Sequence, residues 1–154
     1  MTLLGYRDGQ DHTEGVSYLE LAYFILRYGN NAKSDLQELW SRIVFNICIS
    51  NVDDHLRNHG FLLFQHSWKL APAYDINPVE YGTGLKLNIS EDDNALDLEL
   101  ALDVHEYFRL TLQEAKQIIE EVQWAVAKWR FLANNLNISR KDQELKQSAF
   151  RLAE

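Results

Sequence analysis

Residues 43–64 read IVFNICISNVDDHLRNHGFLLF, and this stretch decides what kind of fold the chain can form. It begins with an uncharged apolar run, passes through a crowded polar segment at 51–59, and returns to apolar residues after Gly60. Apolar residues at helical spacing, then polar residues, then a short apolar run predict a buried helix, a loop and a strand in that order. The charged groups are therefore expected where a buried helix ends.

A β-hairpin is expected directly after this polar segment. Residues 60–64 and 68–71 are two short apolar runs that the polar residues 65–67 separate. Pro72 and Pro78 then favour extended or turn conformations for the residues between them. Because the two ends of a hairpin lie side by side, we expect the segment 51–59 and Asp75 to be neighbours.

Helix starts are marked by a Ser or Thr that Glu or Gln follows three residues later, a pattern typical of capping boxes. The residues are Ser17, Ser34 and Thr111, with a weaker start at Ser139. Helices are expected over 17–29, 34–47, 97–108, 111–136 and after 139, the first ending at Gly29 in a left-handed conformation. The predicted class is mostly α (α+β): one domain over residues 1–154, helical with one small β-hairpin.

Composition excludes several kinds of protein. The chain has 154 residues, 46% hydrophobic and 25% charged, which is ordinary for one globular domain. The net charge of −8 has the wrong sign for general binding to nucleic acid. The uncharged run from Ile43 to Val52 is too short to span a membrane. Cys48, the single cysteine, lies in this run, so we expect a buried thiol, a cytoplasmic location and no membrane partner.

The polar segment carries a spacing that points to phosphoryl transfer. Asp53 and Asn58 are separated as in the catalytic loop of protein kinases, where the Asp accepts the substrate hydroxyl proton and the Asn binds magnesium. Asp75 follows the hairpin, where a kinase has a second magnesium ligand. Carboxylate and amide oxygens suit Mg²⁺. Asn58 and Asp75 are also residue types that bond their own backbone in turns, so this alternative stays open.

Two further interpretations concern the neighbours of Asp53. Asp54 is expected to be a surface residue. His55 and His59, next to these carboxylates, would suit a transition-metal site of an Asp–His metallohydrolase. Histidines four residues apart share a face only on a helix, and Gly60 and the hairpin argue against a helix here. The metallohydrolase is therefore the weaker hypothesis.

Three blocks, at 38–46, 51–61 and 70–78, together resemble the C-terminal lobe of HipA-type serine/threonine kinases, the toxins of bacterial toxin–antitoxin modules. The resemblance implies that Asp53 is the catalytic base and that His55 orders the catalytic loop. It implies Asn58 and Asp75 as Mg²⁺ ligands and Arg57 as a residue facing the phosphates of ATP. It also implies a protein substrate and a DNA-binding antitoxin as a partner.

The chain departs from this family in one respect. Family members carry an N-terminal lobe with a phosphate-binding loop, a nucleotide-binding Lys and an adenine-binding hinge, all upstream of the region matched here. The one Gly-x-Gly of this chain, Gly82-Thr-Gly84, follows Asp75 and lacks a third glycine. We therefore expect a catalytic lobe that needs a separate N-terminal lobe and is inactive alone. The rival hypothesis is a non-catalytic module that binds an antitoxin or another protein.

Overall fold

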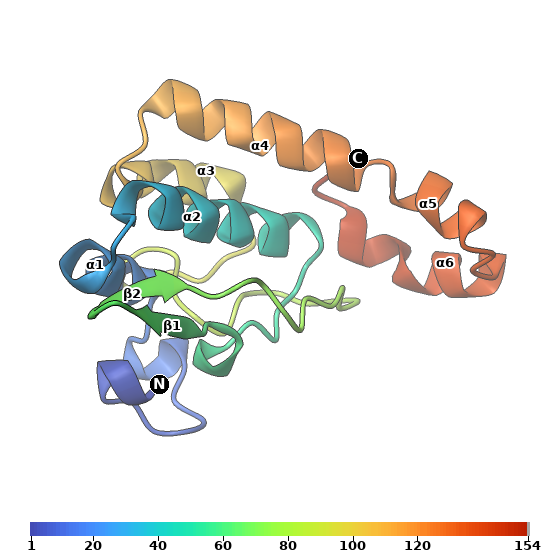
Figure 1. Cartoon of the computed structure of the whole chain (residues 1–154). Helices are drawn as coiled ribbons and strands as arrows, with labels where there is room; N and C mark the ends of the chain where they lie inside the picture. The colour runs from blue at the N-terminus through green and yellow to red at the C-terminus, as the bar shows by residue number, and fades with distance from the viewer. Residues whose placement is uncertain (154) are drawn as a thin grey trace.

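A computed structural model describes residues 1–153 and confirms the mostly α class with one two-stranded antiparallel hairpin (Figure 1). The α-helices are α1 (Tyr18–Tyr28), α2 (Ala32–Cys48), α3 (Leu98–Asp103), α4 (Leu112–Val126), α5 (Trp129–Asn135) and α6 (Arg140–Lys146). Short 3₁₀ segments are η1 (Thr2–Leu4), η2 (His12–Glu14), η3 (Leu56–Asn58), η4 (His105–Phe108) and η5 (Gln147–Phe150). The strands are β1 (Phe61–Phe64) and β2 (Ser67–Leu70).

Helix α2 forms the centre of the core. Its side chains Leu36, Leu39, Trp40, Ile43 and Ile47 are all fully buried, and the helix packs against α1, α3, α4 and β2. The indole nitrogen of Trp40 donates a hydrogen bond to the carbonyl of Ala101 in α3 at 3.2 Å. The core therefore holds the helix that leads into the polar segment in one position.

The predicted helix starts at Ser17 and Thr111 are confirmed, because both residues form complete capping boxes. The predicted start at Ser34 is wrong, since α2 begins at Ala32 after Asn31. In its first turn Asp35 is buried, and its carboxylate accepts a hydrogen bond from the backbone N–H of Leu70 at 2.8 Å. Contact with the hairpin, rather than a capping box, fixes this end of α2.

Gly29 follows α1 as predicted but is extended, with φ −75° and ψ 145°, not left-handed. The reason is that Gly29 and Asn30 run beside Trp68 of β2, and Asn30 donates to the Trp68 carbonyl at 3.0 Å. A Cβ on Gly29 would lie 2.5 Å from the carbonyl oxygen of Ile25. Glycine is needed here for close approach of the backbone and not for positive φ.

The long helix predicted over 111–136 is two helices, α4 and α5, and residues 97–108 form α3 followed by η4. The buried face of α4 ends at Val126, the last residue of that helix. Beyond it, α5 and α6 extend sideways from the body as a helical arm (Figure 1). Several apolar side chains of this arm are exposed: Phe131, Leu132, Leu136, Ile138 and Leu145.

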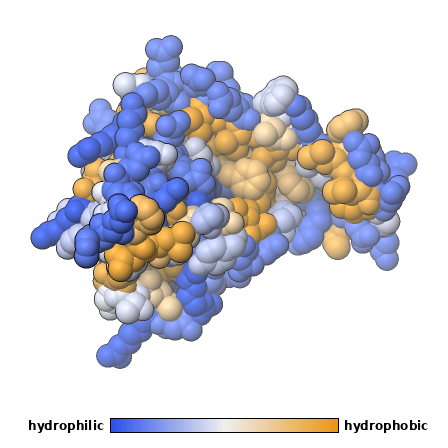
Figure 2. Space-filling model, in the orientation of Figure 1, coloured by the Kyte–Doolittle hydropathy of each residue, from blue (hydrophilic) through white to orange (hydrophobic). Residues whose placement is uncertain are grey.

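The predicted hairpin is confirmed, with Phe61 opposite Leu70 and Phe64 opposite Ser67. Gln65 and His66 form its turn, and both have positive φ, as hairpins of matching twist require. Phe61 packs on Phe24 of α1, with ring centroids 4.7 Å apart. Phe64, in contrast, is 58% exposed and lies with Leu62 and Leu63 in an apolar surface patch (Figure 2).

Two expectations from the sequence concern the single cysteine and membrane-spanning segments. Cys48 is buried at the end of α2, and this burial raises the pKa of its thiol to about 11. Among residues 1–153, no helix is both long and apolar enough to cross a membrane.

Candidate functional site

The polar segment forms a tight loop between α2 and β1. Its first turn is held by α2, because the N–H of Asn51 donates to the carbonyl of Asn46 at 2.8 Å. Its end forms η3, where the N–H of Asn58 donates to the carbonyl of His55 at 2.8 Å. We call residues 50–59 the polar loop.

The hairpin brings the segment that carries Asp75 back to the polar loop, as predicted. The N–H of Ala71 donates to the carbonyl of Gly60 at 2.8 Å, which extends the pairing beyond the strands. The Tyr74 hydroxyl donates to the carbonyl of Arg57. Arg42 of α2 donates to the carbonyl of Ala71 at 2.7 Å and fixes the start of the returning segment.

Asp53 and Asn58 are in direct contact. The amide nitrogen of Asn58, a buried residue, donates to the backbone carbonyl of Asp53 at 3.3 Å. The Asp53 side chain is exposed. Because the amide nitrogen of Asn58 is used in the loop, its amide oxygen is the atom that can bind a cation.

His55 and Arg57 lie on the same side of the loop. Arg57 Nη2 is 3.0 Å from Nε2 of His55, and Nη1 pairs with the carboxylate of Asp8. Asp75 is exposed, has φ 56°, and accepts a hydrogen bond from the Asn77 amide at 2.9 Å. The Asp75 segment thus meets the loop through Tyr74, while the Asp75 carboxylate itself is bonded to Asn77.

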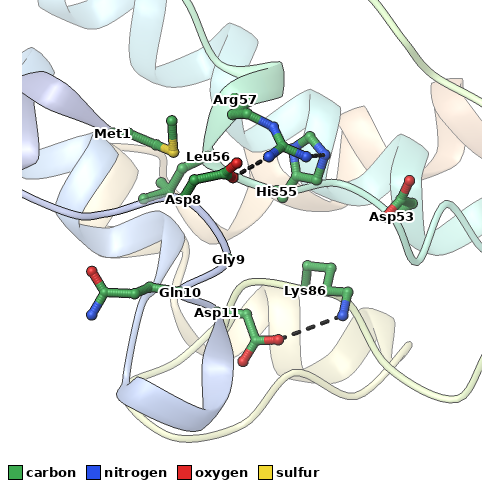
Figure 3. Close-up of a pocket in the computed structure, with 10 residues that line it drawn as sticks. All are labelled: Met1, Asp8, Gly9, Gln10, Asp11, Asp53, His55, Leu56, Arg57 and Lys86. Atoms are coloured by element: carbon green, nitrogen blue, oxygen red, sulfur yellow. Dashed lines mark hydrogen bonds and ion pairs between the residues drawn. The ribbon is translucent and has the colours of Figure 1, made fainter.

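A cavity of about 220 Å³ opens beside the loop and is lined by Asp53, His55 and Arg57 (Figure 3). Its other wall is the N-terminal segment 8–11 together with Lys86. Asp8 reaches Arg57 across the cavity, and Lys86 Nζ is 3.5 Å from Asp11. Hydrogen bonds from Thr13 lower the pKa of Asp11, and His12 and Lys86 add smaller effects in the same direction. Asp75 does not line this cavity.

The available metal ligands are oxygens. Within residues 1–153 there is no group of three or more His, Cys, Asp or Glu side chains that could hold a metal ion. The amide oxygen of Asn58 and the carboxylates of Asp53 and Asp75 are hard donors of the kind that Mg²⁺ prefers, but the Asp75 carboxylate is bonded to Asn77 and lies outside the cavity. His55 and His59 face different partners, Arg57 and Asp54.

The expectation that Asp54 is a surface residue is wrong, since it is only 4% exposed. One of its carboxylate oxygens accepts hydrogen bonds from the Tyr18 hydroxyl at 2.6 Å and the Asn46 amide at 2.7 Å. The same oxygen lies 3.0 Å from Nε2 of His59. Buried partners from α1, from α2 and from the end of the polar loop therefore draw Asp54 inward while its neighbour Asp53 stays exposed.

The structure also reveals a buried segment that the sequence analysis missed. Leu85, Leu87 and Ile89 are buried and alternate with the less buried Lys86 and with Asn88. The segment runs beside residues 12–18, where the N–H of Tyr18 donates to the carbonyl of Asn88 at 2.9 Å. This period of two is a strand-like signal in the sequence, and it places Lys86 at the cavity.

Gly82 and Gly84 have packing roles. A Cβ on Gly82 would clash with a methyl carbon of Val52 in the polar loop. A Cβ on Gly84 would lie 2.8 Å from the Asn94 amide nitrogen. The Gly-x-Gly sequence therefore lets residues 82–84 approach the polar loop and the loop after residue 89.

The chain has an Asp-x4-Asn loop at the foot of a hairpin and a further Asp on the returning segment, the order that the resemblance to HipA-type kinases predicts. The comparison with known families is specific: the family model of the HipA-like C-terminal domain matches residues 1–129. The chain therefore belongs to the HipA-like C-terminal domain family.

A relative supports this assignment. Over 68 residues, which are 44% of this chain, it is 40% identical to a Haemophilus influenzae protein described as "Putative kinase". The match spans 20% of the length of that protein.

Proposed function

We propose that this chain is the C-terminal catalytic lobe of a HipA-like serine/threonine protein kinase, and that it supplies the base and the Mg²⁺ ligands for phosphoryl transfer from ATP. One observation carries the proposal: Asn58 is hydrogen-bonded to the backbone of Asp53, and the Asp75 segment is joined to the same loop through Tyr74 and Arg57. Family membership and the kinase relative support it.

Each residue has a role in this proposal. The exposed Asp53 carboxylate accepts the proton of the substrate hydroxyl. Asn58 and Asp75 hold Mg²⁺ through their side-chain oxygens, and His55 orders the loop through its contact with Arg57. The guanidinium of Arg57 faces the phosphates once it leaves Asp8. Mg²⁺, when bound, neutralises charge that develops on the phosphoryl oxygens.

The nucleotide requires a second wall. In the proposed kinase, the adenine of ATP is held by an N-terminal lobe outside this chain, and the isolated chain transfers little or no phosphate. Phosphoryl transfer depends on positioning and charge neutralisation. A catalytic lobe without the groups that hold the nucleotide therefore loses most of the rate of phosphoryl transfer. The proposed partners are this lobe, a protein substrate and a DNA-binding antitoxin, in the cytoplasm.

A second candidate function is a non-catalytic module that binds an antitoxin or another protein. The exposed apolar side chains on the hairpin and on α5 and α6 favour it, because contiguous apolar surface marks interaction sites. Both functions use the same fold. They differ in whether the chain takes part in phosphoryl transfer that depends on the Asp53 carboxylate.

The test adds an N-terminal HipA-like lobe in trans to this chain with Mg²⁺, radiolabelled ATP and the antitoxin. The proposal predicts label on protein in the mixture, little label with either part alone, and loss of label with Asp53→Asn. Asp92→Asn, a change at another exposed carboxylate, should leave the labelling unchanged. Antitoxin binding without label would favour the binding module. Label that Asp53→Asn does not reduce would contradict the role of Asp53 as the base.

A further inference from the structure

Asp54 is the buried carboxylate of the polar loop, and it has three hydrogen-bonding partners. Its partners come from different parts of the fold: Tyr18 begins α1, Asn46 lies in α2, and His59 follows η3. Asn46 is itself held, since its side-chain oxygen accepts from the Asn51 amide at 3.0 Å. Residues at both ends of the polar loop are therefore tied to one buried group.

Tyr18 is a fixed donor in this cluster. It is fully buried, and its backbone is bonded to Asn88. Burial, followed by the nearby Asp54, raises the pKa of Tyr18 well above its ordinary value, so its hydroxyl keeps its proton. Asp54 is therefore anchored to α1, an element that is distant in sequence.

His59 is oriented by Asp54. Its Nδ1 is buried and has no hydrogen-bond partner among residues 1–153, so Nε2 forms the one polar contact of the ring. The ring meets Tyr18 edge to face, with centroids 5.7 Å apart. His59 directly follows Asn58, and Asp54 directly follows Asp53. The cluster thus holds the backbone beside each of these two site residues.

We infer that Asp54 is a positioning residue: it anchors the polar loop to α1 and α2 and thereby sets the directions in which Asp53 and Asn58 project. The inference rests on the proposed function for the roles of those two residues. Asp54 touches neither substrate nor metal in this account and acts through the loop backbone. Supporting groups that orient metal ligands have measurable effects on affinity.

The experiment compares Asp54→Ala with Asp35→Ala. Asp35 is also a buried carboxylate, but it accepts from Leu70 of the hairpin, away from the polar loop. Two readouts are taken well below the unfolding temperature: the Mn²⁺ dissociation constant of the chain, and hydrogen exchange at the amides of Asn58 and His59, which bond to His55 and Leu56. Mn²⁺ replaces Mg²⁺ because its binding is easy to detect.

Asp54→Ala should weaken Mn²⁺ binding roughly tenfold and speed exchange at both amides by a similar factor, whereas Asp35→Ala changes neither. Asp54→Asn, which keeps the side-chain shape, should recover part of both effects. If Asp54→Ala does not fold, Tyr18→Phe removes one of the three donors and should show a smaller change of the same kind.

Different results would overturn the positioning role of Asp54 and the proposed function. Unchanged exchange at Asn58 and His59 in Asp54→Ala, or in Tyr18→Phe where that variant is used, overturns the positioning role. Absence of Mn²⁺ binding in the unaltered chain contradicts the proposed function, and the exchange data then still decide whether Asp54 holds the loop.

Discussion

The polar loop and the helical arm of α5 and α6 are opposites in what they bury. In the loop the polar side chains of Asn51, Asp54 and Asn58 are buried, and all three are hydrogen-bonded. In the arm the apolar side chains of Phe131 and Leu136 are exposed, the second by 73%. Burying polar groups costs free energy unless they are paired, so the loop is held in one arrangement by specific partners.

A buried hydrogen bond and a more exposed ion pair attach the arm region to the rest of the chain. Ser50 donates to the carbonyl of Ala149 at 2.9 Å, just beyond α6. Lys146 of α6 pairs with Glu80 at 2.8 Å. The family match ends at residue 129, where the arm begins. The polar loop thus buries polar side chains beside the candidate site, whereas the arm exposes apolar ones.

The largest effect is expected from a matched pair of asparagines. Asn46→Ala removes a donor to Asp54 and an acceptor for Asn51, so it should lower the free energy of unfolding by about 2–3 kcal/mol. Asn135→Ala, an exposed position at the end of α5, should change it by less than about 0.5 kcal/mol. Urea unfolding measures both. Equal losses of unfolding free energy in the two variants would contradict the difference between the polar loop and the arm.

An intermediate effect is expected at Gly82. Gly82→Ala forces a methyl group against Val52 and should destabilise the chain by about 1–3 kcal/mol, measured by thermal or urea unfolding. The double variant Gly82→Ala with Val52→Ala should recover part of this loss, because the clash is with the valine methyls. A double variant that is less stable than Gly82→Ala by the full cost of Val52→Ala would rule out the clash.

The smallest effect concerns the ion pair that holds the arm. A hydrogen bond from Lys146 lowers the pKa of Glu80 below its ordinary value. Because the pKa of Glu80 is lowered, the Lys146–Glu80 ion pair contributes its full stabilisation when the pH is above the ordinary glutamate pKa. This stabilisation is lost as the pH falls through the lowered pKa. Carbon-detected NMR titration of Glu80 should show a higher midpoint in Lys146→Ala. Lys141→Ala, on the same helix, should not move the midpoint, and a shift there would contradict the assignment.

The sequence was sufficient for the features that depend on local pattern. The hairpin and the capping boxes at Ser17 and Thr111 follow from residue order and side-chain chemistry within a few positions. The meeting of the polar loop with the Asp75 segment also follows, since a hairpin brings its flanks together. Local chemistry therefore located the candidate site.

Features set by distant contacts were missed. Asp54 and Asp53 are the same residue type side by side, and the partners that bury Asp54 include Tyr18, which lies 36 positions away. Gly29 is extended because of Trp68, and the first turn of α2 is set by Leu70. The Asp8 wall of the cavity depends equally on a long-range pairing, with Arg57. No short window of sequence contains such information.

The proposed site has Asn58 and Asp75 holding one divalent cation beside the base, Asp53. The most direct measurement is paramagnetic broadening by Mn²⁺ in the NMR spectrum of the isotope-labelled chain. The signals of residues 53–58 and 74–76 should broaden first and together, and Asn58→Ala with Asp75→Ala should abolish this pattern. Broadening confined to the exposed acidic residues 91–93, or broadening at 53–58 without 74–76, would contradict a shared site.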